Sequence, residues 1–165
     1  MRENFRDRAL VIRTYDFGEA DRIIVLLTRN HGLVRGVAKG VRRAKSRFGS
    51  RLQLFVNLDV QLYPGRNLYT ISQADTVDYF GARIIEDYDR YTAACAALES
   101  AERLAAAHAP GDPYLYEACV KVLDQLQHGD PLVLLDSFLL QAMSHAGWAP
   151  SLFDCCLLYT SPSPR

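Results

Sequence analysis

The sequence predicts an α+β protein, with a five-stranded β-barrel over residues 1–80 and a small all-α domain over residues 81–154. Two observations indicate this architecture. In residues 52–62, apolar side chains occupy every second position, which is the period of a strand with one buried face. In residues 82–108, apolar side chains recur at spacings of three and four, which is the period of an amphipathic helix. The change of period places the domain boundary near Phe80-Gly81.

Five short segments of the first half have the composition of strands. They are rich in Val, Ile, Leu and Thr, and turn residues separate them. In chain order they cover 8–15, 22–28, 33–39, 52–62 and 68–73. Asn30-His31-Gly32 fits a hairpin loop with glycine in a left-handed conformation, and Pro64-Gly65-Arg66-Asn67 fits a second turn. Five short antiparallel strands suit a Greek-key barrel of the OB type, or an SH3-like barrel. The stretch 40–50 is the one irregular connection.

The second half predicts three helices with short connections. The first covers 82–108. Gly-Asp-Pro occurs at 111–113 and again at 129–131, and each triplet places Asp at an N-cap and Pro at the first helical position. The second and third helices therefore cover about 113–128 and 131–146, and Gly147 ends the last one. Three antiparallel helices joined in this way form a small bundle.

The composition is that of an ordinary folded protein. Nineteen Lys and Arg balance nineteen Asp and Glu, and 49% of the residues are hydrophobic. This excludes a disordered chain, a collagen-like repeat and a small disulfide scaffold. The chain has no apolar run long enough to span a membrane, and residues 1–8 lack the apolar core of a signal peptide. The four cysteines do not form a disulfide framework, so we expect a cytoplasmic protein with reduced thiols.

The net charge of zero hides a strong asymmetry between the two halves. Residues 1–80 hold fourteen basic and eight acidic residues, whereas residues 81–165 hold five basic and eleven acidic residues. A charge split of this kind favours a module that faces nucleic acid or a membrane, joined to an acidic one.

A run of cations without any carboxylate carries the predicted binding chemistry. Its members are Arg35, Lys39, Arg42, Arg43, Lys45, Arg47 and Arg51. Lys and Arg that contact phosphates release condensed counterions, which gives affinity for any nucleic-acid sequence. Phe48 lies within the run, and an aromatic ring there suits stacking on an unpaired base. The predicted DNA-binding set also includes Arg66. The alternative, a solvated loop kept basic for solubility, is less favoured because the run contains no acid.

No pattern of catalytic or metal-binding residues is present. The phosphate-loop pattern GxxxxGK[ST] is missing, as are GxSxG, HExxH and paired carboxylates. The four histidines lack metal-ligand spacing, and His108 and His128 fall near helix C-termini, which favour imidazole. Tyr88 and Tyr91 are expected in the core. We therefore expect no enzyme activity, no cofactor and no metal.

Several segments resemble the RecO family of recombination mediators, and its actinobacterial members in particular. They are residues 8–24 (RALVIRTYDFGEADRII), 28–33 (TRNHGL), 37–43 (VAKGVRR), 46–53 (SRFGSRLQ) and 75–80 (DTVDYF). The resemblance covers residues 1 to about 154 and is most specific over the first eighty. It implies an N-terminal OB fold and a helical C-terminal domain.

The resemblance also implies a function. RecO proteins bind single- and double-stranded DNA, anneal complementary strands coated by single-strand-binding protein, and act with RecR to load RecA at gaps. By this resemblance the cations from Lys39 to Arg51 belong to the DNA-binding part of the barrel, in a bacterial, nucleoid-associated protein. Two alternatives remain. One is an adaptor whose acidic helices dock a basic partner, and the other is an RNA-binding OB protein of translation.

The C-terminal end departs from the family pattern. Many members carry a four-cysteine zinc module that begins with CxxC, and residues 149–155 resemble the approach to it. By this resemblance Cys155 would be the first zinc ligand, and the second would lie three residues later, where Leu158 stands. No later cysteine follows, so we expect no zinc. Residues 155–165 are predicted to be a non-native or disordered tail, with 156–165 resembling translated adapter read-through on a truncated frame. A natural Ser/Pro tail is the alternative. Truncation would leave apolar surface on 131–146 uncovered.

Overall fold

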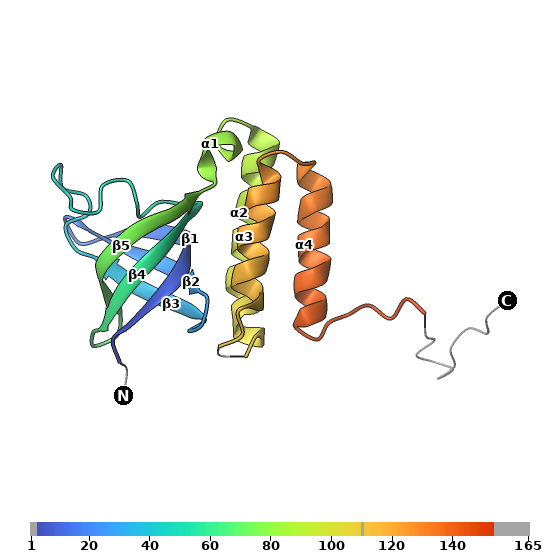
Figure 1. The fold of residues 1–165 in the computed structure, drawn as a ribbon, viewed down its shortest axis with the longest axis horizontal. Coiled ribbons are helices and arrows are strands. Elements are labelled where there is room, and N and C mark those ends of the chain that lie inside the picture. Colours follow the sequence, from blue (N-terminus) through green and yellow to red (C-terminus); the bar gives the residue numbers. More distant parts are fainter. Residues whose placement is uncertain (1–2, 110, 154–165) are drawn as a thin grey trace.

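The computed structural model describes residues 3–109 and 111–153 and shows a closed five-stranded barrel followed by helices (Figure 1). The strands are β1 (Phe5–Phe17), β2 (Asp21–Thr28), β3 (Leu33–Ala38), β4 (Val56–Pro64) and β5 (Tyr69–Tyr79). Their order around the barrel is β1-β2-β3-β5-β4, and β4 pairs back onto β1. All these neighbours are antiparallel except β3 and β5, which are parallel. This is the OB arrangement, so the predicted fold class is confirmed and the SH3-like alternative is excluded.

The helical region contains α1 (Gly81–Ile84), α2 (Tyr88–Leu104), α3 (Tyr114–Leu126) and α4 (Pro131–His145), with a 3-10 turn η1 (Ala105–Ala107) after α2. In Figure 1, α2 and α3 lie next to the barrel and α4 lies on their far side. Asp130 caps α4 as predicted, because its side chain accepts a hydrogen bond from the Val133 backbone N–H at 3.0 Å. Gly147, at a φ of +96°, follows the end of α4.

Alternating side chains fill the barrel. The inward set comes from all five strands and includes Ala9, Val11, Ile24, Leu26, Val34, Leu58, Val60, Leu62 and Ile71. The parallel contact between β3 and β5 requires a glycine, because a Cβ at Gly36 would lie only 2.8 Å from Ile71 Cγ1. Gly32 adopts a φ of +68° in the β2–β3 hairpin, which confirms the predicted glycine turn.

Several predicted element boundaries are wrong. The fifth strand ends at Tyr79 rather than Gln73, because it pairs with β4 as far as Val56. Two further errors have a local reason. The fourth strand begins at Val56 rather than Leu52, because Phe55 adopts a left-handed φ of +68° that interrupts extended backbone. The predicted helix 82–108 is divided at residues 85–87. There Asp87 takes an extended conformation and its side chain accepts a hydrogen bond from the Arg90 backbone N–H, which starts α2 afresh.

The tyrosines of α2 do not occupy the core as expected. Tyr88 is 79% exposed and Tyr91 is 40% exposed, with the Tyr91 ring edge-to-face against Phe55 at a centroid separation of 6.0 Å. The buried face of α2 is made instead by small residues and two leucines. They are Ala93, Ala94, Ala97, Leu98, Ala101 and Leu104. The i, i+3 and i+4 spacing also fits this face, so periodicity alone does not distinguish the buried face of α2 from the face that carries the two tyrosines.

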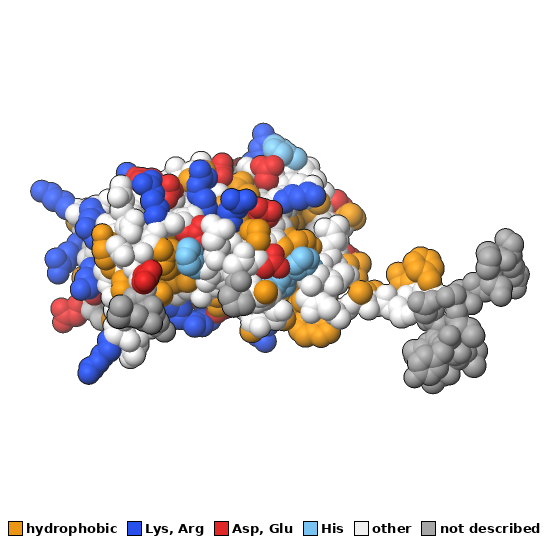
Figure 2. All heavy atoms as spheres, turned by 60° about the horizontal axis from the view of Figure 1, so that its bottom comes forward, with side chains coloured by type: hydrophobic (Ala, Val, Ile, Leu, Met, Phe, Trp, Pro, Cys, Tyr) orange, Lys and Arg blue, Asp and Glu red, His pale blue; other side chains and the backbone are white. Residues whose placement is uncertain are grey.

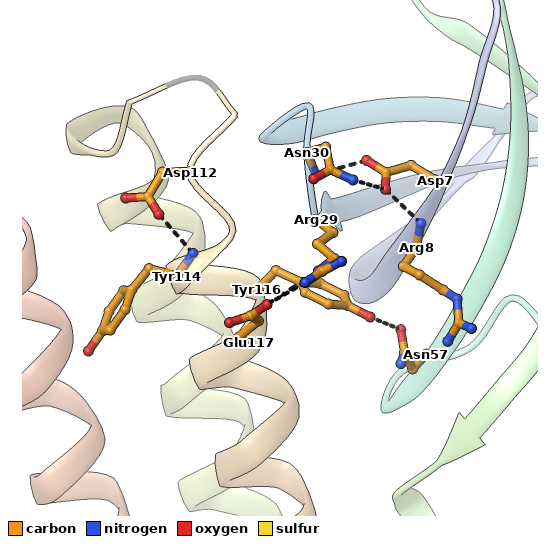
Figure 3. A network of polar contacts seen from close by, with 9 residues as sticks. All are labelled: Asp7, Arg8, Arg29, Asn30, Asn57, Asp112, Tyr114, Tyr116 and Glu117. Atoms are coloured by element: carbon orange, nitrogen blue, oxygen red, sulfur yellow. Dashed lines mark hydrogen bonds and ion pairs between the residues drawn. The ribbon is translucent and has the colours of Figure 1, made fainter.

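The barrel and the helices share one apolar cluster. Leu10, Val25 and Phe55 from the barrel side pack in the same cluster as Leu98 and Leu123 from α2 and α3. A buried polar contact also joins the two parts (Figure 3): the Tyr116 hydroxyl donates to Asn57 Oδ1 at 2.8 Å.

We predict that Tyr116→Phe lowers the free energy of unfolding by about 1–2 kcal/mol, because Asn57 Oδ1 then loses its donor in a buried site. Asn57 is 3% exposed and Tyr116 is 6% exposed. Tyr114→Phe is the matched control on the same helix, since no hydrogen bond of the Tyr114 hydroxyl is recorded within the described residues. Urea unfolding measures both. Equal, small losses for the two variants would show that the Tyr116 contact contributes nothing.

A second contact ties the end of α4 to the start of α3. His145 Nε2 lies 2.7 Å from Asp112 Oδ2, and the His145 ring stacks on Tyr114 at a centroid distance of 3.7 Å. Asp112 Oδ1 accepts from the Tyr114 backbone N–H at 2.9 Å. The prediction that Asp112 is the N-cap is wrong, because Pro113 occupies that position and α3 begins at Tyr114. The hydrogen bond from His145, aided by that backbone N–H, lowers the pKa of Asp112 below its ordinary value.

We predict an acid-sensitive contribution from this contact. A carboxyl group with a lowered pKa stabilises the fold above its ordinary value of 3.8, and the contribution is lost as the pH falls through the folded-state pKa. Melting temperature between pH 7 and pH 3 measures it. Asp112→Asn should flatten the acid side of the curve, whereas Asp136→Asn, at an exposed position of α4, should leave it unchanged. Identical curves for the two variants would contradict this assignment.

Candidate nucleic-acid interface

The connection between β3 and β4, residues 39–55, is folded over one end of the barrel; we call it the cap loop. Successive turns shape it, with Ser46 N–H donating to Arg43 O and Arg51 N–H donating to Phe48 O, both at 3.1 Å. Phe48 and Leu52 are 2% and 3% exposed and belong to the barrel core cluster. The cap loop is therefore an ordered surface held by its own apolar residues.

Hydrogen bonds fix the start and the middle of the cap loop to the barrel. Gly40 N–H donates to Asp21 Oδ1 at 2.7 Å, and Arg42 N–H donates to the carbonyl of Ala20 at 3.0 Å. Across the barrel end, Arg47 and Arg51 donate to backbone carbonyls of β5 at 3.4 and 3.2 Å. The cap loop thus extends from the β1–β2 hairpin to β5.

Six of the predicted cations are gathered on the cap loop, and all are exposed. They are Lys39, Arg42, Arg43, Lys45, Arg47 and Arg51. Arg42 lies 3.7 Å from Asp16 and Arg51 lies 4.0 Å from Asp75, in solvent-exposed pairs that contribute little stability. Within the described residues, the other four form no recorded salt bridge. Figure 2 shows Lys and Arg side chains projecting from the barrel end of the molecule, opposite the helices.

Phe48 is not the stacking platform that the sequence suggested. Its ring is buried, and the Arg47 guanidinium covers it at 4.7 Å from the ring centroid. Burial of an aromatic ring of this size stabilises the fold, whereas exposure of the ring among the charged side chains would not. The ring therefore closes the barrel end. No base can reach it in this conformation.

Sequence reasoning missed two exposed aromatic residues beside the cap loop. Tyr15 and Phe17, near the end of β1, are 41% and 48% exposed. Phe17 precedes Gly18, whose carbonyl accepts a hydrogen bond from Arg42 Nη1 at 3.4 Å. The signal was the alternation of Arg13, Tyr15 and Phe17, which places three large side chains on the outer face of one strand.

The structure separates Arg35 and Arg66 from the cap loop. Arg35 lies on β3 and its guanidinium points toward α2, with Nη2 3.8 Å from Glu102 Oε1. Arg66 lies in the β4–β5 turn. Because β3 and β5 are parallel and Gly36 pairs with Tyr69, Arg66 lies toward the start of β3, whereas Lys39 follows its end. The cap loop and the β4–β5 turn are therefore at opposite ends of the barrel (Figure 1).

The β2–β3 hairpin, near the Arg66 end, is organised by a buried carboxylate (Figure 3). Asp7 is 6% exposed and accepts hydrogen bonds from the backbone N–H and side-chain amide of Asn30, each at 2.9 Å. Beside it, Arg29 pairs with Glu117 of α3 at 2.9 Å. The Asp7 contacts lie within the barrel, and the exposed Arg29–Glu117 pair links the barrel with α3.

The described residues contain no metal site and no membrane-spanning helix beside the cap loop. Among residues 3–109 and 111–153, no three His, Cys, Asp or Glu are grouped to hold a metal ion. Burial raises the pKa of the Cys119 thiol, so that thiol is unreactive. In the same part of the chain, no helix has the length and hydropathy needed to cross a membrane. Cys155 and the predicted tail 155–165 lie outside the described residues.

Two family models match the chain, one on each side of the junction between β5 and α1. The model described as Recombination protein O N terminal matches residues 1–80, and that described as Recombination protein O C terminal matches residues 85–164. The resemblance to the RecO family is therefore confirmed for both parts. Proteins of this family are recombination mediators and not enzymes. The chain belongs to the RecO family.

Proposed function

We propose that this chain binds DNA through the cap loop and acts in gap repair by annealing complementary strands. Membership of the RecO family implies the mediator role, and the cap loop supplies the surface for it. The observation that carries the proposal is the set of six exposed cations on a loop anchored by buried Phe48 and Leu52. Each cation that meets a phosphate adds affinity by counterion release, whatever the base sequence.

Annealing of this kind makes no covalent bond. Two polyanionic strands repel each other, and a cationic surface lowers that repulsion when both are bound to it. Because the cap loop is already ordered, its cations lose less conformational freedom on binding than they would in a mobile loop. The acidic helices lie on the opposite side of the barrel from the cap loop, and their charge would lower the affinity of DNA for that side.

The partners follow from the family. We propose that the chain acts with RecR to load RecA on strands coated by single-strand-binding protein, in the bacterial cytoplasm and in association with the nucleoid. Arg66 stays a proposed DNA contact, at a separate location from the cap loop.

The test is annealing of two complementary fluorescent oligonucleotides by the full chain, in competition with unlabelled DNA or structured RNA. We expect faster annealing with the chain than without it, and stronger competition by single-stranded DNA than by RNA. Failure to accelerate annealing would contradict the proposed activity. Stronger competition by RNA would favour the RNA-binding alternative.

One observation favours the adaptor alternative. On α4, Leu132, Val133 and Leu140 are 69%, 65% and 58% exposed, which is unusual for adjacent large apolar residues. A protein partner would cover such a face. An adaptor without DNA affinity would not accelerate annealing, so the same experiment separates the adaptor from the mediator.

A further inference from the structure

A cleft of about 560 Å³ lies between the barrel and α2, away from the cap loop cations. Apolar residues including Ile12, Leu33 and Leu98 form part of its lining. Its charged residues are Arg13, Arg35, Arg103, Glu99 and Glu102. The cleft therefore combines apolar surface with three cations and two carboxylates, and the pairing among these charges determines what it can bind.

A single carboxylate of α2 forms ion pairs with two arginines of the barrel. Glu102 Oε1 lies 2.9 Å from Arg13 Nη2 and 3.8 Å from Arg35 Nη2. The Glu102 side chain is 18% exposed, whereas those of Arg13 and Arg35 are 52% and 47% exposed. The two guanidinium groups thus keep open faces toward solvent and share a single anionic oxygen. Glu99, by contrast, pairs with Arg103 of its own helix at 3.0 Å.

The strand register connects this cleft with the cap loop. Arg13 pairs with Val25, and Val25 pairs with Arg35, so Arg13 and Arg35 project from the same outer face of the sheet. Tyr15 follows on that face two residues after Arg13, and Lys39 stands just past the end of β3, four residues after Arg35. Four residues of strand span roughly 13 Å. The outer face that carries exposed Tyr15 therefore connects the start of the cap loop, at Lys39, with Arg13 and Arg35 in the cleft.

We propose that a nucleic-acid strand held by the cap loop continues along this face into the cleft, where its phosphate displaces the Glu102 carboxylate from Arg13 and Arg35. This inference rests on the proposed function. Glu102 is then a built-in competitor: its single charge offsets part of the charge of the two arginines while no strand is bound, and this lowers the affinity of the strand for this end of its path. The guanidinium group binds either anion, because its planar set of N–H donors matches both carboxylate and phosphate.

The surroundings favour a nucleic acid over an acidic peptide as the occupant. The Arg13 guanidinium lies 5.6 Å from the centroid of the Tyr15 ring, and that ring is exposed on the face along which the strand would run. An exposed ring beside cations suits a base and its phosphate together. The face also continues into the cap loop, where the cations outnumber their carboxylate partners.

The test compares Glu102→Gln with Glu99→Gln as its matched control. Both remove one negative charge from exposed or partly exposed positions of α2, but only Glu102 contacts the two barrel arginines. We expect E102Q to bind a labelled single-stranded oligonucleotide about three- to fivefold more tightly than wild type at fixed salt. E99Q should change affinity less than about twofold. Adding Arg13→Ala and Arg35→Ala to E102Q should abolish the gain.

The outcomes separate this inference from the proposed function. If wild type binds the oligonucleotide and E102Q behaves as E99Q does, the inference is wrong and the proposed function stands. If wild type does not bind at low salt, the proposed function fails and the inference fails with it. A gain in affinity for poly-aspartate without a gain for the oligonucleotide would identify an acidic peptide as the occupant and overturn the proposal.

Glu102 also joins two parts of the fold, so the melting temperature of E102Q is measured alongside. If E102Q melts far below wild type, Arg35→Ala takes its place in the test. The proposal then predicts that the slope of log affinity against log salt becomes shallower by about 0.7 for single-stranded DNA, because one phosphate contact is lost. An unchanged slope would overturn the proposal, since a purely structural Arg35 would not contribute to it.

Discussion

Replacing Phe48 with alanine is expected to lower the free energy of unfolding by about 3–5 kcal/mol. The ring is 2% exposed and closes the end of the barrel together with Leu52. Its removal deletes apolar contacts and leaves a cavity beneath the cap loop. The six cap loop cations would then lose the anchor that orders them, so we also expect weaker oligonucleotide binding. Urea unfolding and fluorescence anisotropy measure the two effects.

Phe48→Leu separates the core role from a stacking role. Leucine keeps an apolar side chain of similar volume, so the expected cost is below about 1.5 kcal/mol and the oligonucleotide affinity should be retained. A ring that stacked on a base would behave in the opposite way, because its loss costs about 1–3 kcal/mol of binding. Unchanged stability with a large loss of affinity in Phe48→Leu would show that Phe48 contacts DNA.

The second large effect is expected from Arg42→Ala combined with Arg43→Ala. Both side chains are exposed on the cap loop, and Arg42 is bound only by the hairpin carbonyl of Gly18 and by exposed Asp16 within the described residues. Removing both should weaken duplex binding for every base sequence. The plot of log affinity against log salt should become shallower by about two units, one for each lost phosphate contact.

Arg83→Ala combined with Lys121→Ala is the matched control for this variant. It removes the same charge from exposed positions of the helical region. We expect its salt slope to equal that of wild type. If the cap loop variant also keeps the wild-type slope, Arg42 and Arg43 do not contact phosphates. If both variants lose slope equally, the affinity depends on total charge rather than on the cap loop.

The barrel could be predicted because its signals are local. Alternating apolar residues and a glycine turn determine strands and a hairpin within a few residues of each other. The break in the helix at residues 85–87 was not predicted, because Ile84 and Tyr88 are four residues apart, as they would be on one continuous helix. The only local signal was Asp87, a residue type that often caps a helix N-terminus. No local pattern indicates the left-handed conformation of Phe55, whose side chain packs in the apolar cluster shared with the helices.

The site was predicted in composition but not in arrangement. A run of cations in the sequence indicates a charged surface, yet it does not tell which members share a face. Arg35 still lies within β3, where alternation turns it toward α2, whereas Lys39 has left the strand. Phe48 was assigned to the surface because of its charged neighbours. Its burial depends on the barrel end that it closes, which is made by residues distant in sequence.

The central claim is that the cap loop neutralises phosphates, and the salt dependence of oligonucleotide affinity tests it most directly. Anisotropy titrations of the full chain with a single-stranded oligonucleotide should give a slope of log affinity against log salt at least as steep as about −4. This value follows if all six cap loop cations contact phosphates, each contributing about 0.7. The slope should not depend on base sequence. Absence of binding at low salt, or binding that is indifferent to salt, would contradict the claim.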